Sequence, residues 1–268
     1  MDWLEALILG LIQGITEFLP VSSSGHLELG KVLLNVEAQD DITFTVVVHG
    51  ATVLSTLVVF FKEVWELLKG SFKFKWNPET QYLAKIVVSM IPVVIVGLFL
   101  EDYIESFFGG KIQFVGLMLI VTSILLSLTY FLRNKIQERK LGYGSAFAMG
   151  VAQAFAVLPG ISRSGATIAT GILMGNDKKE IAQFSFLMVL VPIIAANVKS
   201  LIDFDGAGAI AGAAIGSIPL LIGFLAAFIT GWLACSWMVN LVKKGKLIWF
   251  ALYCFVIGLL AIISGFII

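Results

Sequence analysis

The sequence is poor in charged residues, and this shortage limits the class of protein it encodes. Charged residues make up 13% of the 268 residues, whereas hydrophobic residues make up 59%. A soluble domain usually carries about 25% charged residues. Half that fraction, together with long apolar runs, predicts an integral membrane protein. The formal net charge is zero, so the total indicates neither an acidic nor a basic partner.

Three further sequence features are rare or absent: cysteines, a nucleic-acid-binding pattern and a cleavable signal. The two cysteines, Cys235 and Cys254, lie inside apolar segments, which is typical of packing residues and argues against a disulfide framework or a cysteine metal site. No basic stripe interleaved with aromatic residues is present, so a nucleic-acid partner is not expected. The first basic residue is Lys31, so the start of the chain lacks the positive region of a cleavable signal.

Long apolar segments dominate what is present. A helix needs about 20 apolar residues to cross a bilayer, and six segments meet this length: 44–61, 82–100, 112–132, 181–201, 209–239 and 247–267. Two further stretches, 3–34 and 142–175, are apolar but broken by polar residues. We therefore expect an all-α polytopic membrane protein with six transmembrane helices and two re-entrant helical hairpins, because irregular backbone at membrane depth must be buried in protein.

The two broken stretches resemble each other at a constant offset. Five residues of the first stretch recur 140 residues later in the second stretch. The matched pairs are Gly10 and Gly150, Gln13 and Gln153, Ser22 and Ser162, Ser24 and Ser164, and Gly25 and Gly165. This indicates an internal duplication, with one repeat over 1–140 and the other over 141–268. Three crossings in each repeat would invert the second relative to the first, which is the inverted-topology architecture.

Basic residues are unevenly divided between the two sets of loops that these spans imply. One set holds 14 lysines and arginines, and the opposite set holds three, namely Lys31, Lys111 and Lys199. Excess positive charge marks the cytoplasmic side. We therefore expect both termini and the first hairpin on the outer side of a cell membrane, and the second hairpin to enter from the cytoplasm.

Glu17 lies in an otherwise apolar run. A carboxylate at membrane depth is unfavourable unless it is paired, so a functional role is the first hypothesis, and a carboxylate reaching the outer interface is the alternative. Gln13 lies four residues earlier, on the same helical face. The two side chains could hold a water or share a hard cation through oxygen.

The segment 22–26 (Ser-Ser-Ser-Gly-His) precedes an apolar helical stretch. Capping explains one serine but not three followed by Gly and His. A helix N-terminus with small residues exposes backbone amides to an anion. Ser23 and His26 are three residues apart on one face, so the histidine could act as the base for a serine nucleophile. A histidine that only forms a hydrogen bond at a helix start is the alternative.

Arg163 lies between two serines in the second broken stretch. A guanidinium inside the membrane needs an anionic partner. Glu17 is one candidate, which would form a structural ion pair, and a phosphate gripped by the planar guanidinium is the other. The expected catalytic residues are Glu17, Ser23, His26 and Arg163, a set that suits phosphoryl transfer on a lipid substrate. The expected phosphate-binding residues are Ser22, Ser24, Gly25, Gly160, Ser162, Arg163, Ser164, Gly165 and Thr167.

Other polar or aromatic residues in apolar surroundings are expected to be structural. His49, beside Gly50 in the first predicted span, is interpreted as a hydrogen-bonded packing residue, with a role in the site as the alternative. Trp65 and Trp76, which lie among lysines, are typical of anchors at the membrane interface. The segment 62–69 is expected to lie amphipathically on the inner surface.

Two segments resemble a known family. Residues 13–26 (Gln-Gly-Ile-Thr-Glu-Phe-Leu-Pro-Val-Ser-Ser-Ser-Gly-His) and 159–167 (Pro-Gly-Ile-Ser-Arg-Ser-Gly-Ala-Thr) resemble the two signatures of the bacterial undecaprenyl-diphosphate phosphatases, the bacitracin-resistance family. The resemblance in length and segment order covers essentially the whole chain. It implies hydrolysis of undecaprenyl diphosphate to undecaprenyl phosphate and inorganic phosphate, at a site open to the outer face, which recycles the lipid carrier of peptidoglycan and other envelope polymers.

The resemblance also implies a Mg²⁺ or Ca²⁺ requirement and particular residue roles. The family's acidic pair falls on Gln13 and Glu17, its proposed nucleophile on Ser23, its histidine on His26 and its arginine on Arg163. Gln13 stands where many members have Glu, so this chain has one carboxylate fewer for a metal. Ser24 also departs from the pattern, since other members often have Thr there.

Other functions share part of this pattern. A secondary transporter or polyprenyl-lipid flippase is the rival class, because inverted repeats with broken helices are commonest in transporters and fold alone does not settle function. A phosphatidic-acid-type lipid phosphatase would share the chemistry. A Ser23–His26 pair facing Arg163 favours the enzyme. The expected partners are undecaprenyl diphosphate and the lipid bilayer, and a homodimer is left open.

Overall fold

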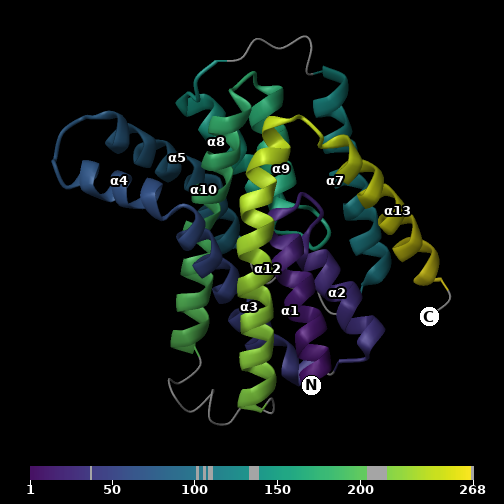
Figure 1. The fold of residues 1–268 in the computed structure, drawn as a ribbon. Helices are drawn as coiled ribbons and strands as arrows, with labels where there is room; N and C mark the ends of the chain where they lie inside the picture. Colours follow the sequence, from purple (N-terminus) through teal and green to yellow (C-terminus); the bar gives the residue numbers. More distant parts are fainter. Residues whose placement is uncertain are drawn as a thin grey trace.

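The computed structural model describes residues 1–36, 38–100, 103–104, 107, 111–132, 139–203 and 216–266. Within these ranges the chain is all-helical (Figure 1). The helices are α1 (Trp3–Phe18), α2 (Ser23–Leu34), α3 (Ala38–Val59), α4 (Phe61–Ser71), α5 (Pro78–Phe99), α7 (Ile112–Leu132), α8 (Tyr143–Phe155), α9 (Arg163–Leu173), α10 (Lys178–Asp203), α12 (Ser217–Lys243) and α13 (Ile248–Ser264).

Several of these helices are long and apolar enough to cross a membrane. Among the described residues, Pro78–Phe99, Ile112–Leu132 and Ser217–Val242 meet the length and hydropathy of a span. Thr43–Val59 and Phe61–Ser71 do so together, although they meet at a 76° bend, and Ile248–Ser264 is apolar but shorter. The protein is therefore a polytopic, all-helical membrane protein. The number of six spans stays a prediction, and part of the expected span 209–239 lies outside the described residues.

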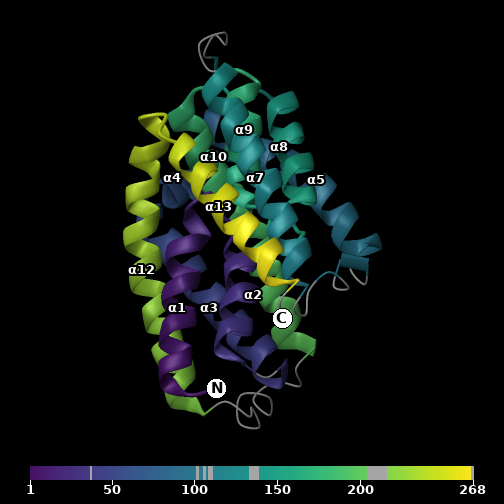
Figure 2. The same cartoon turned by 90° about the vertical axis from the view of Figure 1, so that its right-hand side faces the viewer.

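The two broken stretches each form a helical hairpin. Helices α1 and α2 are joined by residues 19–22, and α8 and α9 are joined by 156–162. In Figures 1 and 2 the first hairpin occupies the lower part of the molecule and the second the upper part, and their turns meet near the middle. The amide of Gly160 donates to Ser22 Oγ over 3.2 Å, and Ser164 Oγ donates to the Leu19 carbonyl over 3.3 Å. The turns are thus bonded to each other.

Each hairpin packs closely on a long helix through a glycine. In α1, a Cβ at Gly10 would lie 2.5 Å from the carbonyl oxygen of Gly223 in α12. In α8, a Cβ at Gly150 would overlap the carbonyl oxygen of Ser89 in α5. Small residues allow helix backbones to approach this closely in membranes. The matched motif positions Gly10 and Gly150 therefore make matched contacts with different helices.

Helices α7 and α13 meet through a reciprocal pair of glycines. A Cβ at Gly116 would lie 2.6 Å from the Gly258 carbonyl oxygen, and a Cβ at Gly258 would lie 2.7 Å from the Gly116 carbonyl oxygen. Ser123 of α7 also donates to the Ala251 carbonyl of α13 over 2.7 Å. This contact fixes α13 beside the turns of the hairpins.

The orientation of the protein in the membrane stays a prediction. Several charged residues on which it depends lie outside the described residues, namely Glu37, Glu101, Asp102, Glu105, Arg133, Lys135 and Asp205. The expected amphipathic segment 62–69 falls within α4, whose apolar side chains Phe61, Trp65 and Leu68 are exposed, as Trp76 beyond it also is.

Candidate active site

Glu17, in the last turn of α1, is the centre of a buried polar cluster. Its Oε1 accepts a hydrogen bond from Arg163 Nη2 over 2.9 Å. Its Oε2 accepts from Ser23 Oγ over 2.5 Å and from Gln13 Nε2 over 2.9 Å. His49 Nε2 lies 3.9 Å from the same oxygen. The Glu17 side chain is only 6% exposed, so these partners replace the solvation that burial removes.

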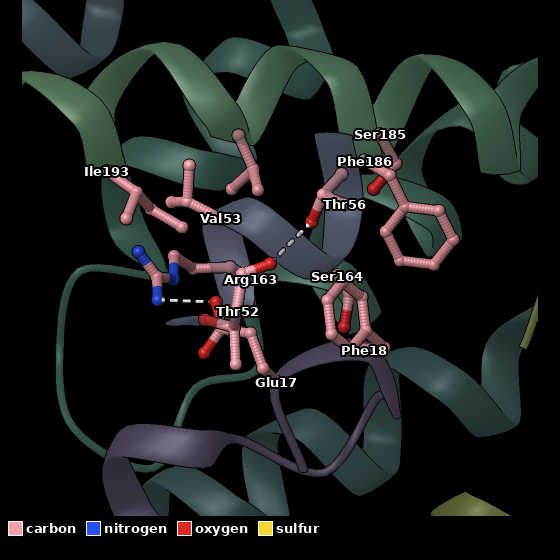
Figure 3. A pocket seen from close by; sticks show the side chains of 11 residues that line it. Glu17, Phe18, Thr52, Val53, Thr56, Arg163, Ser164, Ser185, Phe186 and Ile193 are labelled. Carbon is pink, nitrogen blue, oxygen red and sulfur yellow. Dashed lines mark hydrogen bonds and ion pairs between the residues drawn. The ribbon is translucent and has the colours of Figure 1, made fainter. Parts of the chain in front are cut away.

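The cluster is assembled from both hairpins and from α3. Gln13 precedes Glu17 by one helical turn, and Ser23 opens α2 after the first hairpin turn. Arg163 is the first residue of α9 in the second hairpin, and Figure 3 shows its guanidinium directed at Glu17. The sequence allowed two anionic partners for Arg163, Glu17 or a phosphate. In the structure its partner is Glu17. The Arg163 side chain is still 25% exposed and lines a pocket beside the pair.

His26 is held differently from the sequence-based expectation. Its Nδ1 lies 2.8 Å from the Ser22 carbonyl oxygen and its Nε2 lies 2.9 Å from the Tyr253 hydroxyl. Ser23 instead donates its hydroxyl to Glu17. The expected Ser23–His26 pair is therefore replaced by a Ser23–Glu17 pair. The reason is local, because the carbonyl oxygen of the N-cap residue Ser22 lies one helical turn before His26 and accepts a hydrogen bond from its ring.

The serines of the two turns act mainly as helix caps. Ser22 Oγ accepts from the amide of Gly25 over 3.3 Å, and Ser162 Oγ accepts from the amide of Gly165 over 3.0 Å. Each cap hydroxyl also lies near the serine two residues later, at 3.4 Å for Ser24 and 3.3 Å for Ser164. The amides expected to bind phosphate at Gly25, Gly160 and Gly165 thus already donate to serines.

A narrow pocket opens beside the Glu17–Arg163 pair (Figure 3). Hydroxyls from α3 and α10 line it, from Thr52, Thr56 and Ser185, together with Ser164. Thr167 Oγ1 lies 2.6 Å from Ser185 Oγ, which connects α9 to α10. The remaining lining is apolar and consists of Phe18, Val53, Phe186, Val189 and Ile193. The pocket thus combines the Glu17–Arg163 ion pair and several hydroxyls with an apolar wall, which suits a ligand with a polar head and an apolar chain.

The sequence interpretation missed the contributions of α3 and α10. His49 forms a hydrogen bond, as expected, since its Nδ1 lies 2.8 Å from the Thr45 carbonyl oxygen, but its Nε2 also faces Glu17. His49, Thr52 and Thr56 follow the spacing i, i+3 and i+7, which places polar side chains on one face of an apolar helix. That stripe was a usable signal for His49, Thr52 and Thr56. Ser185 had no comparable pattern in the sequence.

The donor set of the cluster fits a hard cation only in part. Gln13 Oε1 is buried without a hydrogen-bond partner, so it is free to coordinate. Glu17 supplies carboxylate oxygens, and Mg²⁺ and Ca²⁺ prefer such oxygen ligands. Among the described residues, however, no group of three or more His, Cys, Asp or Glu could hold a metal ion. Gln13 and Glu17 together supply fewer oxygens than a hard cation takes, so further ligands would have to come from outside the protein.

The fold and this site define a polytopic membrane protein in which the turns of two helical hairpins meet at a buried Glu17–Arg163 pair beside a pocket. Comparison with protein families identifies it further: residues 6–260 match the family described as bacitracin resistance protein BacA, and the chain belongs to this family.

Curated relatives align over nearly their whole length. An undecaprenyl-diphosphatase from Bacteroides thetaiotaomicron is 53% identical, covering 98% of this chain and 99% of the relative. One from Christiangramia forsetii is also 53% identical, covering 99% of both chains. A more distant one from Halothermothrix orenii is 37% identical, covering 98% of both chains.

Proposed function

We propose that this protein hydrolyses undecaprenyl diphosphate to undecaprenyl phosphate and inorganic phosphate. This recycles the lipid carrier for peptidoglycan and other envelope polymers and confers bacitracin resistance. Relatives named undecaprenyl-diphosphatase align over nearly the whole chain. The observation in the structure that carries the proposal is the Ser23 hydroxyl bonded to Glu17, which is itself bonded to Arg163 beside a hydroxyl-lined pocket.

The diphosphate binds at Arg163, whose side chain is partly exposed and lines the pocket. Ser164 and Thr167 lie within one turn of Arg163 and supply hydroxyls, and the N-terminus of α9 favours negative charge. The other expected phosphate-binding residues form hydrogen bonds with one another and so shape the phosphate-binding site. They are Ser22, Ser24, Gly25, Gly160, Ser162 and Gly165. The polyprenyl tail extends along the apolar wall of the pocket.

Ser23 is the proposed nucleophile and Glu17 its proton acceptor. The short Ser23–Glu17 hydrogen bond places the carboxylate to take the hydroxyl proton as Oγ attacks the terminal phosphorus. The bond from that phosphorus to the bridging oxygen breaks, and undecaprenyl phosphate leaves. Water then cleaves the phosphoserine, releasing inorganic phosphate and restoring Ser23. Arg163 neutralises charge on the transferred group. His26, whose Nδ1 bonds the carbonyl of Ser22, the residue before the nucleophile, holds the start of α2 so that Ser23 faces Glu17.

Direct attack by water, activated by Glu17 or His26, is the alternative route. A rapid quench that traps phosphate on Ser23 supports the serine route, whereas no trapped phosphate in a slowly hydrolysing variant supports direct attack.

A divalent cation, Mg²⁺ or Ca²⁺, completes the proposed site. Glu17 and Gln13 Oε1 would hold it together with diphosphate oxygens. When bound, it supplies positive charge that neutralises the phosphates.

We also propose the finer architecture and its orientation. Six spans and two re-entrant hairpins form an inverted repeat of 1–140 and 141–268, in the cytoplasmic membrane of a bacterium, with both termini and the pocket opening on the outer side. Matched contacts at Gly10 and Gly150 and the reciprocal Gly116–Gly258 contact support the repeat. The unequal distribution of lysine and arginine supports the orientation.

The decisive experiment measures phosphate release from a short-chain prenyl diphosphate by the purified protein in detergent with Mg²⁺. We expect release to be lost in Arg163→Ala and in Ser23→Ala. Unchanged release in Arg163→Ala would remove this residue from the site. Lipid translocation without phosphate release would favour a flippase, and equally fast cleavage of diacylglycerol phosphates would indicate a general lipid phosphatase.

A further inference from the structure

The imidazole of His26 is held from two sides by groups distant in the sequence. Its Nδ1 lies 2.8 Å from the Ser22 carbonyl oxygen, and its Nε2 lies 2.9 Å from the hydroxyl of Tyr253 in α13. A carbonyl oxygen only accepts, so in the neutral ring Nδ1 carries the proton. Nε2 then accepts the hydroxyl proton of Tyr253. The two contacts together select one tautomer of His26.

The two aromatic rings are also stacked. The ring centroids of His26 and Tyr253 lie 5.5 Å apart, and the ring planes differ by 11°. A hydrogen bond alone would leave the imidazole free to tilt about the bond, and stacking alone would leave it free to slide. The combination defines both the place and the plane of the ring.

Helix α13 is itself anchored to the rest of the site. The thiol of Cys254, next to Tyr253, lies 3.6 Å from the carbonyl oxygen of Pro20 in the first hairpin turn. Two residues before Tyr253, the carbonyl of Ala251 accepts a hydrogen bond from Ser123 of α7. Tyr253 therefore approaches His26 from a helix that is fixed both to α7 and to the turn that precedes α2.

We propose that Tyr253 is a positioning residue for His26 in this phosphatase. It holds the imidazole as the Nδ1–H tautomer with Nε2 turned toward α13. The proposal rests on the proposed function for its effect on turnover, because it acts only through His26. Tyr253 lies in neither of the two motifs, and it comes from the end of the chain opposite to His26.

Histidine ¹⁵N NMR tests the contact without any activity. The chain has only two histidines, so a histidine-labelled sample gives two sets of ring signals, and the signals lost in His49→Gln belong to His49. Tyr253→Phe keeps the ring and removes the hydroxyl. We expect the Nε2 resonance of His26 to move downfield while the His49 resonances stay. An unchanged His26 resonance would overturn the proposal.

Kinetics test the consequence. Tyr253→Phe is expected to lower kcat about five- to tenfold, the scale of one hydrogen bond, and to change KM by less than about twofold. In a His26→Gln background the same substitution should cause no further loss. An equal loss in that background would show that Tyr253 acts elsewhere, against the proposal.

Tyr143→Phe is the matched control. Tyr143 opens α8, is 40% exposed and lies under the ammonium group of Lys85. Its substitution should leave kcat, KM and the histidine spectrum unchanged. A loss of kcat equal to that of Tyr253→Phe would indicate a general effect of removing tyrosine hydroxyls and would overturn the assignment.

The two proposals fail separately. If the wild-type protein releases no phosphate from prenyl diphosphates, the proposed function is wrong, while the NMR shift still supports or overturns the Tyr253–His26 contact. If the wild-type protein is active and Tyr253→Phe keeps full kcat, only the positioning role is wrong.

Discussion

Arg163 and Glu17 are separated by 146 residues, yet the guanidinium Nη2 lies 2.9 Å from the carboxylate Oε1. Glu17 lies in the last turn of α1 and Arg163 begins α9, each beside a hairpin turn, and the two turns meet inside the molecule. The pair neutralises two charges that neither hairpin could hold alone in an apolar environment. The meeting of the hairpins is therefore what makes the buried site stable.

Replacing Glu17 should harm both stability and activity. Glu17→Gln leaves the Arg163 charge without its partner, and breaking such a buried pair reduces the free energy of unfolding by about 3–5 kcal/mol. It also removes the proposed proton acceptor of Ser23, so phosphate release should fall by about 10²- to 10⁴-fold. Thermal unfolding in detergent and the release assay measure the two effects. Glu66→Gln, an exposed carboxylate on α4, should change neither.

Gln13→Glu should alter the response to divalent cations. The new carboxylate would lie beside Glu17, whose Oε2 is 2.9 Å from the present amide nitrogen. Two adjacent carboxylates repel each other without a cation and bind one more tightly. We expect lower activity in chelator and a lower Mg²⁺ concentration for half-maximal phosphate release. An unchanged Mg²⁺ titration would show that this position does not contribute to cation binding.

The buried amide of Gln153 predicts an unusual stability result. Gln153 is the repeat counterpart of Gln13, is 1% exposed, and neither its Nε2 nor its Oε1 has a hydrogen-bond partner. Removing an unsatisfied buried polar group is neutral or stabilising. Gln153→Met should therefore keep phosphate release and leave the free energy of unfolding unchanged or raised by about 1 kcal/mol.

Gln13→Met provides the contrast, because it removes the hydrogen bond to Glu17 and should lower phosphate release. A strong loss of stability in Gln153→Met would instead reveal that its amide is bonded, for example to an ordered water.

The glycine contact between α7 and α13 should not tolerate a methyl group. A Cβ at Gly116 would lie 2.6 Å from a backbone oxygen of α13, which cannot move independently of its helix. Overpacking of this kind destabilises by about 1–3 kcal/mol, more than the helix propensity that alanine adds. We expect Gly116→Ala to unfold at lower temperature in detergent.

Gly97→Ala in α5 is the control, because nothing lies within 4 Å of its Cβ position. It should be neutral or slightly stabilising. Equal behaviour of the two variants would argue against a close α7–α13 contact.

Local chemistry made much of the architecture predictable. The low charge and long apolar runs predicted an all-helical membrane protein, and the structure is all-helical in the ranges it describes. The polar breaks predicted helical starts at the serines, and Ser22 and Ser162 are the N-caps of α2 and α9. Apolar patterning and capping act within a few residues, so the sequence shows them directly.

The partners of the two histidines were not predictable in the same way. Helical spacing placed His26 beside Ser23, but the Ser22 carbonyl and Tyr253 engage its ring, and Tyr253 is 227 residues away. His49 forms the expected hydrogen bond, to the Thr45 carbonyl, but its approach to Glu17 depends on how α3 packs against the first hairpin. Helical periodicity defines which face a side chain occupies but not what covers that face.

By itself the sequence determined the membrane class, the broken helices and the polar residues that apolar surroundings would not tolerate unpaired. Those properties follow from hydrophobicity and local hydrogen bonding. Only the tertiary structure decided which of these groups pair, namely Arg163 and Ser23 with Glu17 and Tyr253 with His26. The pairing depends on the packing of distant helices, which approach closely at glycines, and no local pattern encodes which helices meet.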